Sequence, residues 1–439
     1  MGEDAMHKKR TKIWTRTLAS CLLMTSAFTY GNAIQATNVT EQLASDAPLS
    51  LLVDSGGPHL NDVQSAVYGT LPPIISNVTA VTYSVYGTEE PRIRMGFGQG
   101  MAIDDRGALW VWGSVQSQGG NSYQTPKLIA GMDHDVVDAF IGTHNVVLKN
   151  DGTVWTWGDN RFGQLGDGTT VSRETAEQVP TLSDITAISA GESYILALKK
   201  DGTVWAWGSN EFGELGVGAT TQQTVPMQVQ GLNDVMSVSA AGWHNLALTK
   251  DGTVWAWGAN GQGQLGDGTS SSRNIPFQID GIHGVKAVSA GYDHSLALLN
   301  DGTVWAWGHN EYGELGDKTN KGHAAPVQVA GLAQVASISA GEWYSMALKE
   351  DGTVWAWGSN SYGQLGNGTP GHQNSPVQVP GIAASQISAG FYASGALGTN
   401  GGYYTWGSNI FGQLGNQEEN LQLYPQGING LNSKASREN

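Results

Sequence analysis

The chain has 439 residues, of which 61 are glycine and 14% are charged, and its formal net charge is −16. So much glycine indicates many turns and argues against long amphipathic helices, while 40% hydrophobic residues suffice for a folded core. The acidic balance argues against nucleic-acid binding, because Lys and Arg must displace counterions from the phosphates.

The first 33 residues have the order of a secretory signal peptide. Five basic residues precede an apolar run from Leu18 to Phe28, and small residues follow it. The run is too short to span a bilayer stably, so we expect a signal peptide over 1–33 that is cleaved, with an uncleaved membrane anchor as the alternative. Cys21 is the only cysteine, so the exported part would contain no disulfide and no thiolate metal site.

Residues 34–90 form an extension before the repeats, and their role stays open. Val81-Thr82-Tyr83-Ser84-Val85 alternates like a strand and could pair with a terminal repeat to close a ring. The prolines of this segment favour a surface linker instead.

Seven Trp-Gly pairs then recur at intervals of about fifty residues. The equivalent tryptophans are Trp112, Trp157, Trp207, Trp257, Trp307, Trp357 and Trp406. A period of this length is typical of solenoids and propellers, in which one unit cannot bury its own faces and needs its neighbours.

Each unit has the pattern of four short strands. In the unit that begins at Val285, the pair Asp301-Gly302 separates two β-rich runs and predicts a hairpin with a type I′ turn, which needs positive φ at both central positions. The next strand places Trp305 and Trp307 on one face and small apolar residues on the other, so we expect the indoles to pack between neighbouring sheets. The small residues of Ser289-Ala290-Gly291 fit a crowded innermost strand.

Three motifs recur together: Ser-Ala-Gly-x-x-His-Ser-x-Ala-Leu, Asp-Gly-x-Val-Trp-x-Trp-Gly and Asn-x-x-Gly-Gln-Leu-Gly. This combination resembles the regulator of chromosome condensation repeat family over residues 91–431, which leaves 432–439 as a tail. The resemblance implies an all-β fold, a seven-bladed β-propeller of four-stranded antiparallel blades. It also implies guanine-nucleotide exchange on a small GTPase and chromatin association, which the acidic charge and the expected export oppose.

Two sets of recurring polar residues are candidate ligands. The Gly-Gln-Leu-Gly loops repeat Asn and Gln or Glu, which suits local turn chemistry better than a ring of carboxamide ligands. His144, His244 and His294 share one repeat position, but they belong to different units and Tyr replaces them elsewhere, so we expect structural hydrogen bonding and no metal.

The short turn before that position varies from unit to unit, as expected of residues that are free to serve recognition. We expect these turns around the mouth of the axial channel, where aromatic rings beside carboxylates could bind sugar or peptide groups, with ordinary packing as the alternative. The candidate binding residues are Phe97, Glu192, Trp243, Tyr292, Asp293, Glu342, Trp343, Phe391 and Tyr392.

The sequence contains no familiar catalytic, phosphate-binding or calcium-binding motif, and we expect no cofactor. The leading hypothesis is a monomeric binding or scaffold module, secreted or on the cell surface, for a protein or glycan partner. The alternatives are a guanine-nucleotide exchange factor or GTPase regulator, and an extracellular polysaccharide lyase or hydrolase that uses Tyr, His and Glu side chains of the axial mouth.

Overall fold

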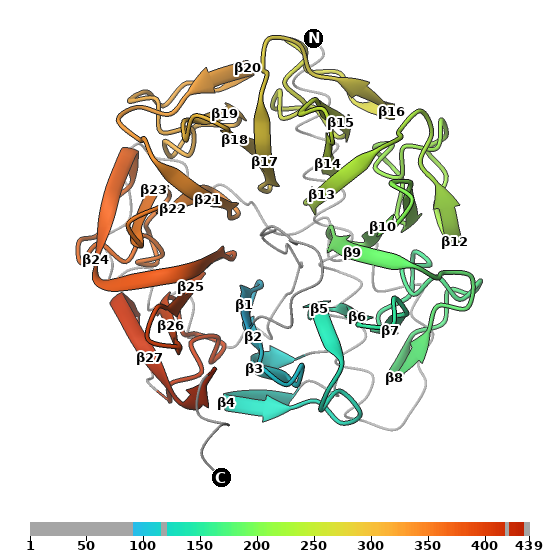
Figure 1. Cartoon of the computed structure of the whole chain (residues 1–439), viewed down its shortest axis with the longest axis horizontal. Helices are drawn as coiled ribbons and strands as arrows, with labels where there is room; N and C mark the ends of the chain where they lie inside the picture. The colour runs from blue at the N-terminus through green and yellow to red at the C-terminus, as the bar shows by residue number, and fades with distance from the viewer. Residues whose placement is uncertain (1–90, 116–120, 418–420, 434–439) are drawn as a thin grey trace, which may run out of the picture. The chain divides into compact units, whose positions relative to one another are not determined.

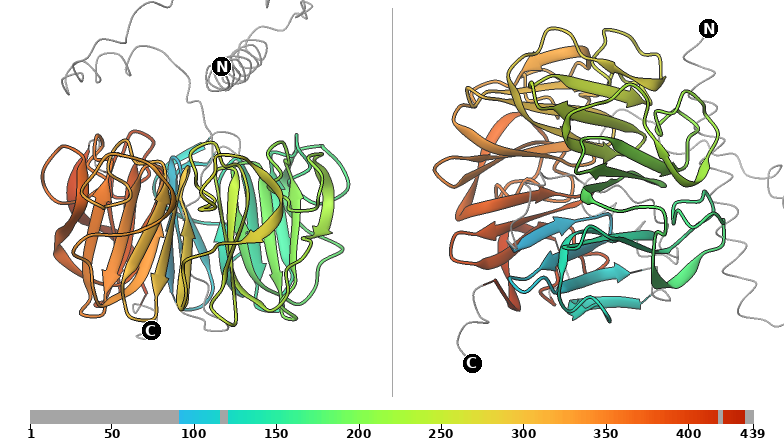
Figure 2. Two further views of the ribbon diagram at one scale, coloured as in Figure 1. Left: turned by 90° about the horizontal axis from the view of Figure 1, so that it is seen from above. Right: turned by 45° about the vertical axis from the view of Figure 1, so that its right-hand side comes forward.

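The computed structural model describes residues 91–115, 121–417 and 421–433, and the regular structure within these ranges is β-strand. The strands form seven antiparallel four-stranded blades in a ring, with the first strand of each blade nearest the axis (Figure 1). Seen from the side, the strands run between the two faces of the ring (Figure 2). This confirms the all-β, seven-bladed fold. In the described part of the chain, no helix could cross a bilayer.

The strands follow one another in chain order within each blade. Blades 1 to 3 contain β1 (Arg92–Met95), β2 (Gln99–Ile103), β3 (Leu109–Val115), β4 (Asn121–Leu128); β5 (Val136–Phe140), β6 (His144–Lys149), β7 (Val154–Gly158), β8 (Arg173–Gln178); β9 (Ile185–Ala190), β10 (Tyr194–Lys199), β11 (Val204–Gly208) and β12 (Gln223–Gln228). Blades 4 and 5 contain β13 (Val235–Ala241), β14 (His244–Thr249), β15 (Val254–Gly258), β16 (Arg273–Gln278); β17 (Val285–Ala290), β18 (His294–Leu299), β19 (Val304–Gly308) and β20 (His323–Gln328).

The last two blades are joined in one seven-stranded sheet. They contain β21 (Val335–Ala340), β22 (Tyr344–Lys349), β23 (Thr353–Gly358), β24 (Gln373–Ala389), β25 (Ala393–Gly398), β26 (Gly402–Gly407) and β27 (Gln422–Asn432). The long strand β24 pairs with β23 up to Ala383 and with β25 from Ala384 onward, so it is the outer strand of blade 6 and the inner strand of blade 7.

The Asp-Gly hairpins differ from the predicted type I′ turns. In the turn after β18, the Gly302 N–H donates to the Leu299 carbonyl at 3.0 Å, and only Gly302 has positive φ, at 78°. This is a three-residue loop in which a β-turn is followed by a left-handed glycine. The Asp301 side chain supports this turn, because its Oδ1 accepts hydrogen bonds from the backbone N–H and the hydroxyl of Thr303, at 2.9 and 2.7 Å.

The second tryptophan of each pair joins neighbouring blades, as predicted. Trp307 is fully buried, and its indole N–H donates to the Gln264 carbonyl of the preceding blade at 2.8 Å. Burial of one such ring stabilises the fold by roughly 2–3 kcal/mol. Trp112 of blade 1 makes the same bond to the Gln413 carbonyl of blade 7, at 2.7 Å, so the ring closes through an interface of the usual kind.

The serine of the Ser-Ala-Gly motif also links blades, which its small size alone does not predict. Ser289 Oγ accepts a hydrogen bond from the Ala340 N–H of the next blade at 3.0 Å. Ser388 Oγ accepts from the Met95 N–H at 2.9 Å, which carries the same link across the closure between blades 7 and 1. The strand predicted at residues 81–85 lies outside the described residues, and its part in closure stays a prediction.

Candidate binding site at the axial mouth

The turn between the first and second strands of each blade lies at the same end of every blade, so these inner turns share one face of the ring. We call it the inner-turn face. All predicted binding residues lie in these turns: Phe97 after β1, Glu192 after β9, Trp243 after β13, Tyr292 and Asp293 after β17, Glu342 and Trp343 after β21, and Phe391 and Tyr392 in the turn between β24 and β25.

The structure brings the aromatic members of this set together. The Tyr292 ring centroid lies 5.1 Å from that of Trp243 and 6.3 Å from those of Trp343 and Phe391. The Phe97 centroid lies 4.6 Å from that of Phe391, across the closure of the ring. Tyr292 and Phe391 come from blades 5 and 7, so their contact bypasses blade 6. The rings therefore pack against one another over the axis instead of standing apart around an open rim.

A second set of aromatic residues, which the sequence reasoning missed, surrounds this cluster. Tyr312 lies 5.7 Å from Trp343 and Tyr362 lies 4.5 Å from Tyr392, measured between ring centroids. Phe212 and Phe411 take the same place beside Trp243 and Phe97. The sequence feature that could have revealed these residues is the aromatic residue that recurs just before the first glycine of the Gly-Gln-Leu-Gly loops.

Three carboxyl groups from three blades, those of Glu192, Asp293 and Glu342, lie close enough to interact electrostatically. Burial, followed by the charges of Asp293 and Glu214, raises the pKa of Glu192 to about 8. Burial, followed by the charges of Asp293 and Glu192, raises the pKa of Glu342 well above its ordinary value. Glu342 is only 2% exposed. In the described part of the chain, the buried Oε2 atoms of Glu192 and Glu342 have no hydrogen-bond partner.

The third carboxyl group is differently placed. Asp293 Oδ1 accepts a hydrogen bond from Gln264 Nε2 at 2.9 Å, so the Gly-Gln-Leu-Gly loop of blade 4 supports the inner turn of blade 5. The loops otherwise show the predicted local chemistry. Asn260 Oδ1 accepts from the Leu265 N–H at 3.0 Å, and Gln264 Oε1 accepts from the Gln262 N–H at 2.8 Å.

The three histidines of the shared repeat position lie beneath the inner turns, at the starts of β6, β14 and β18. Each ring is buried, and burial lowers the pKa of His144 to about 4 and those of His244 and His294 to about 3. His244 Nε2 and His294 Nε2 lie 2.9 and 3.0 Å from serine hydroxyls of the following blades. Among the described residues, no group of three or more His, Cys, Asp or Glu side chains is arranged to hold a metal ion.

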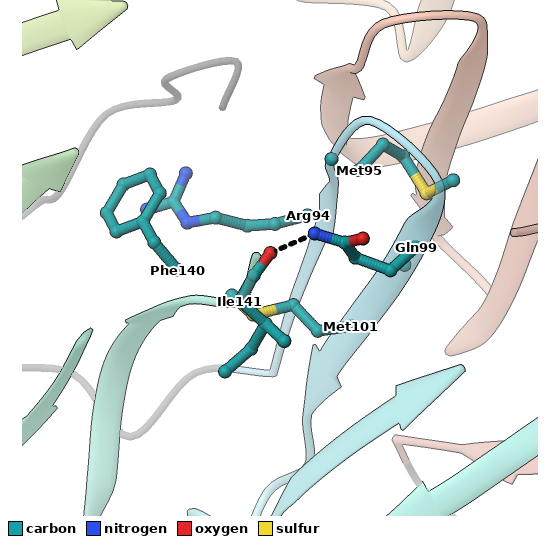
Figure 3. A pocket seen from close by; sticks show the side chains of 8 residues that line it. Arg94, Met95, Gln99, Met101, Phe140 and Ile141 are labelled. Carbon is teal, nitrogen blue, oxygen red and sulfur yellow. Dashed lines mark hydrogen bonds between the residues drawn. The ribbon is translucent and has the colours of Figure 1, made fainter. Parts of the chain in front are cut away.

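A small cavity lies between blades 1 and 2 (Figure 3). Arg94 and Gln99 reach into it, and Gln99 donates a hydrogen bond to the Ile141 carbonyl. The Arg94 guanidinium lies 5.0 Å from the Phe140 ring centroid and is bonded to both carboxylate oxygens of Asp138. These paired groups join the two blades, and the cavity was not predicted from the sequence.

The fold and the inner-turn face define a class of ring-shaped repeat protein in which each blade contributes one variable turn to a common face. The chain belongs to the RCC1-like domain family, whose profile matches residues 108–438. This confirms the predicted repeat family.

Two curated relatives match short stretches. The chain is 31% identical to human E3 ubiquitin-protein ligase HERC2 over 123 residues, which cover 26% of this chain and 2% of the relative. It is 37% identical to the RCC2 homologue of Danio rerio over 75 residues, which cover 16% of this chain and 15% of the relative. The chain thus spans a small part of the length of these relatives.

Solved structures resemble the whole ring. Prp20p of Saccharomyces cerevisiae, described with its binding to Gsp1p and histones, is 23% identical with a TM-score of 0.65, and the match covers 73% of this chain and 85% of that one. Human WBSCR16 is 24% identical with a TM-score of 0.61, and the match covers 67% and 83% of the two chains. At this identity the likeness shows the fold alone.

Proposed function

We propose that the protein is a binding module that holds a partner protein at the inner-turn face. The observation that carries the proposal is the gathering of the variable turns: residues that differ from blade to blade form one aromatic and acidic cluster at this face. Five of the nine are buried, namely Phe97, Tyr292, Asp293, Glu342 and Phe391, and the other four are partly exposed. Partly exposed Trp243, Trp343 and Tyr392 are large, rigid contact residues of the kind that dominate protein interfaces. Prp20p, which shares the fold, is described as binding Gsp1p and histones, and this supports a protein partner.

The proposal includes export of the chain, either into the medium or to the cell surface. Its support is the predicted signal peptide over 1–33, which lies outside the described residues. Removal of five basic and two acidic residues leaves 17 basic and 36 acidic residues, a net charge of −19. Such a surface favours a basic partner and disfavours nucleic acid.

The test begins with partners captured from the native source by the wild-type protein. The Trp243→Ala/Trp343→Ala variant is then compared with Lys200→Ala/Lys250→Ala, which changes two exposed hairpin residues between the second and third strands, at the other face of the ring. We expect the tryptophan variant to lose the partner and the lysine variant to retain it. Equal retention by both variants would place the interface elsewhere. A glycan array run with the same variants tests the glycan alternative.

Two other functions receive less support. Regulation of a small GTPase follows from the family resemblance, and finding the mature protein only outside the cell membrane would rule it out. A lyase or hydrolase would need an accessible histidine beside the Tyr and Glu side chains. His144, His244 and His294 are at most 3% exposed, so the shared repeat position provides no histidine at the surface. The exposed His372 lies 4.9 Å from Tyr312 between ring centroids, so an activity assay decides this alternative. Unchanged polysaccharide size after incubation with the protein would exclude it.

A further inference from the structure

Two carboxyl groups of the inner-turn face are placed as if for a ligand. Glu342 is 2% exposed, Glu192 has a buried Oε2, and neither Oε2 accepts a hydrogen bond within the described residues. Buried carboxylates in proteins are normally paired or hydrogen-bonded, because desolvation of the charged group is costly. Gln264 supplies such a bond to Asp293, at 2.9 Å, but no equivalent donor among the described residues reaches Oε2 of Glu192 or Glu342.

Aromatic faces accompany these carboxyl groups. Trp343 follows Glu342 directly in the chain, and both Trp343 and Trp243 contact Tyr292 while remaining partly exposed. The face of an indole ring attracts a cation that approaches within about 6 Å of its centroid. Carboxylates that accept hydrogen bonds, together with ring faces that attract charge, form the usual surroundings of a bound organic cation.

We propose that the axial mouth binds a cationic side chain, lysine or arginine, of the partner protein, with Glu192 and Glu342 as its carboxylate ligands and Trp243 and Trp343 as its ring contacts. This inference rests on the proposed function and names the chemistry of the partner. An organic cation fits better than a metal ion, since no cluster of the described residues has the arrangement of a metal site.

The direct test uses capped pentapeptides of glycine with a central lysine, arginine, acetyl-lysine or glutamine, and titration calorimetry on the full chain. We expect the lysine or arginine peptide to bind at least about tenfold more tightly than either neutral peptide, from charged hydrogen bonds and cation–π attraction together. Equal affinity for charged and neutral peptides, or no binding of either charged peptide, would overturn the proposal.

Two matched variants locate the site. Glu192→Gln/Glu342→Gln keeps side-chain size and removes both charges, and we expect it to weaken binding of the charged peptide by about tenfold or more. Glu174→Gln/Glu350→Gln removes two exposed carboxylates elsewhere, so affinity should stay unchanged. An equal loss in both variants would indicate attraction by net charge only, and would overturn the site. Circular dichroism checks that each variant is folded.

The pH dependence of peptide binding provides a second test. Since a cation binds the ionised carboxylates, its affinity should rise between pH 5 and pH 8, and calorimetry in buffers of different ionisation enthalpy should detect proton release. The groups that interact electrostatically with these two carboxyls are Asp293, Glu214, Tyr312, Tyr344, Tyr362 and Tyr392. The tyrosine pKa values are raised, so these residues stay neutral in this range. Affinity that does not change with pH would contradict the assignment of Glu192 and Glu342.

Comparison with the captured partner separates this inference from the proposed function. If Trp243→Ala/Trp343→Ala releases the partner and Glu192→Gln/Glu342→Gln retains it, the inner-turn face is the interface and the cation site is wrong. If both variants retain the partner, both proposals fail.

Discussion

The imidazole Nε2 of His244 lies 2.9 Å from the hydroxyl oxygen of Ser295, which belongs to the next blade. Ser295 uses its single hydroxyl hydrogen to donate to the Gln264 carbonyl at 2.8 Å, so it accepts from the His244 N–H. His294 and Ser345 repeat the arrangement at 3.0 Å. A shared repeat position thus joins consecutive blades through a buried histidine and serine pair.

Replacement of Ser295 by alanine should destabilise the ring at this interface. The change leaves the His244 N–H buried without its partner, at about 1–3 kcal/mol for an unsatisfied group, whereas the Gln264 carbonyl keeps its bond from the Trp307 indole. We expect a loss of about 1–3 kcal/mol in the free energy of unfolding, measured by urea denaturation at pH 7. Ser270→Ala, at an exposed loop position, is the control and should change little. A loss below about 0.5 kcal/mol would mean that water replaces the hydroxyl.

His144 should behave in the opposite way, because neither of its ring nitrogens has a hydrogen-bond partner in the described part of the chain. The residue at the serine position of the next blade is Ile195, which offers no hydroxyl. We therefore expect His144→Phe to leave stability at pH 7 unchanged or to raise it by about 1 kcal/mol. A loss above about 2 kcal/mol in urea denaturation would contradict this and indicate a bonded imidazole.

The same variant should resist acid better than the wild type. Burial lowers the pKa of His144 to about 4, against the weaker opposing charge of Asp159. Between pH 6.5 and 4 only the unfolded chain takes up this proton, so acid destabilises the folded state by up to about 1.4 kcal/mol per pH unit for each such histidine. His144→Phe removes one of these contributions, and its stability curve should diverge from that of the wild type below pH 6.5. His283→Gln, at an exposed position, should follow the wild type.

Glu192→Gln should raise stability at alkaline pH. The folded-state pKa of Glu192 is about 8, above the ordinary value of 4.5, because of burial and then the charges of Asp293 and Glu214. The stability that depends on this proton is complete below pH 4.5 and is lost as pH rises through 8. Glutamine resembles the protonated acid, so the variant should be more stable than the wild type at pH 8–9 and equal to it at pH 4. Thermal melts at both pH values test this, and parallel curves would show that Glu192 ionises normally.

The sequence repeat made the fold predictable, whereas contacts between residues at different repeat positions could not be predicted from the sequence. The recurrence of the tryptophan at the position of Trp307 predicted the packing between blades, because each interface between neighbouring blades needs the same buried ring. Gly291 was interpreted as a small residue for a crowded axis, but a Cβ there would lie 2.4 Å from the His294 ring, so this glycine makes room for the imidazole. The contact between Tyr292 and Phe391 depends on how far the rings extend over the axis, which periodicity does not contain. The raised pKa of Glu342 likewise depends on its burial in the assembled ring and then on the charges of Asp293 and Glu192 from other blades.

Ring closure offers the last test, because the serine link has the same geometry inside the ring and across its ends. Ser289 Oγ accepts from the Ala340 N–H at 3.0 Å, and Ser388 Oγ accepts from the Met95 N–H at 2.9 Å. Alanine at either position leaves a buried backbone N–H unsatisfied, so each variant should lose about 1–3 kcal/mol in urea denaturation. If Ser388→Ala costs as much as Ser289→Ala, blades 1 and 7 unfold together with the rest of the ring. A much smaller cost at Ser388 would mean that the closure opens before the other interfaces.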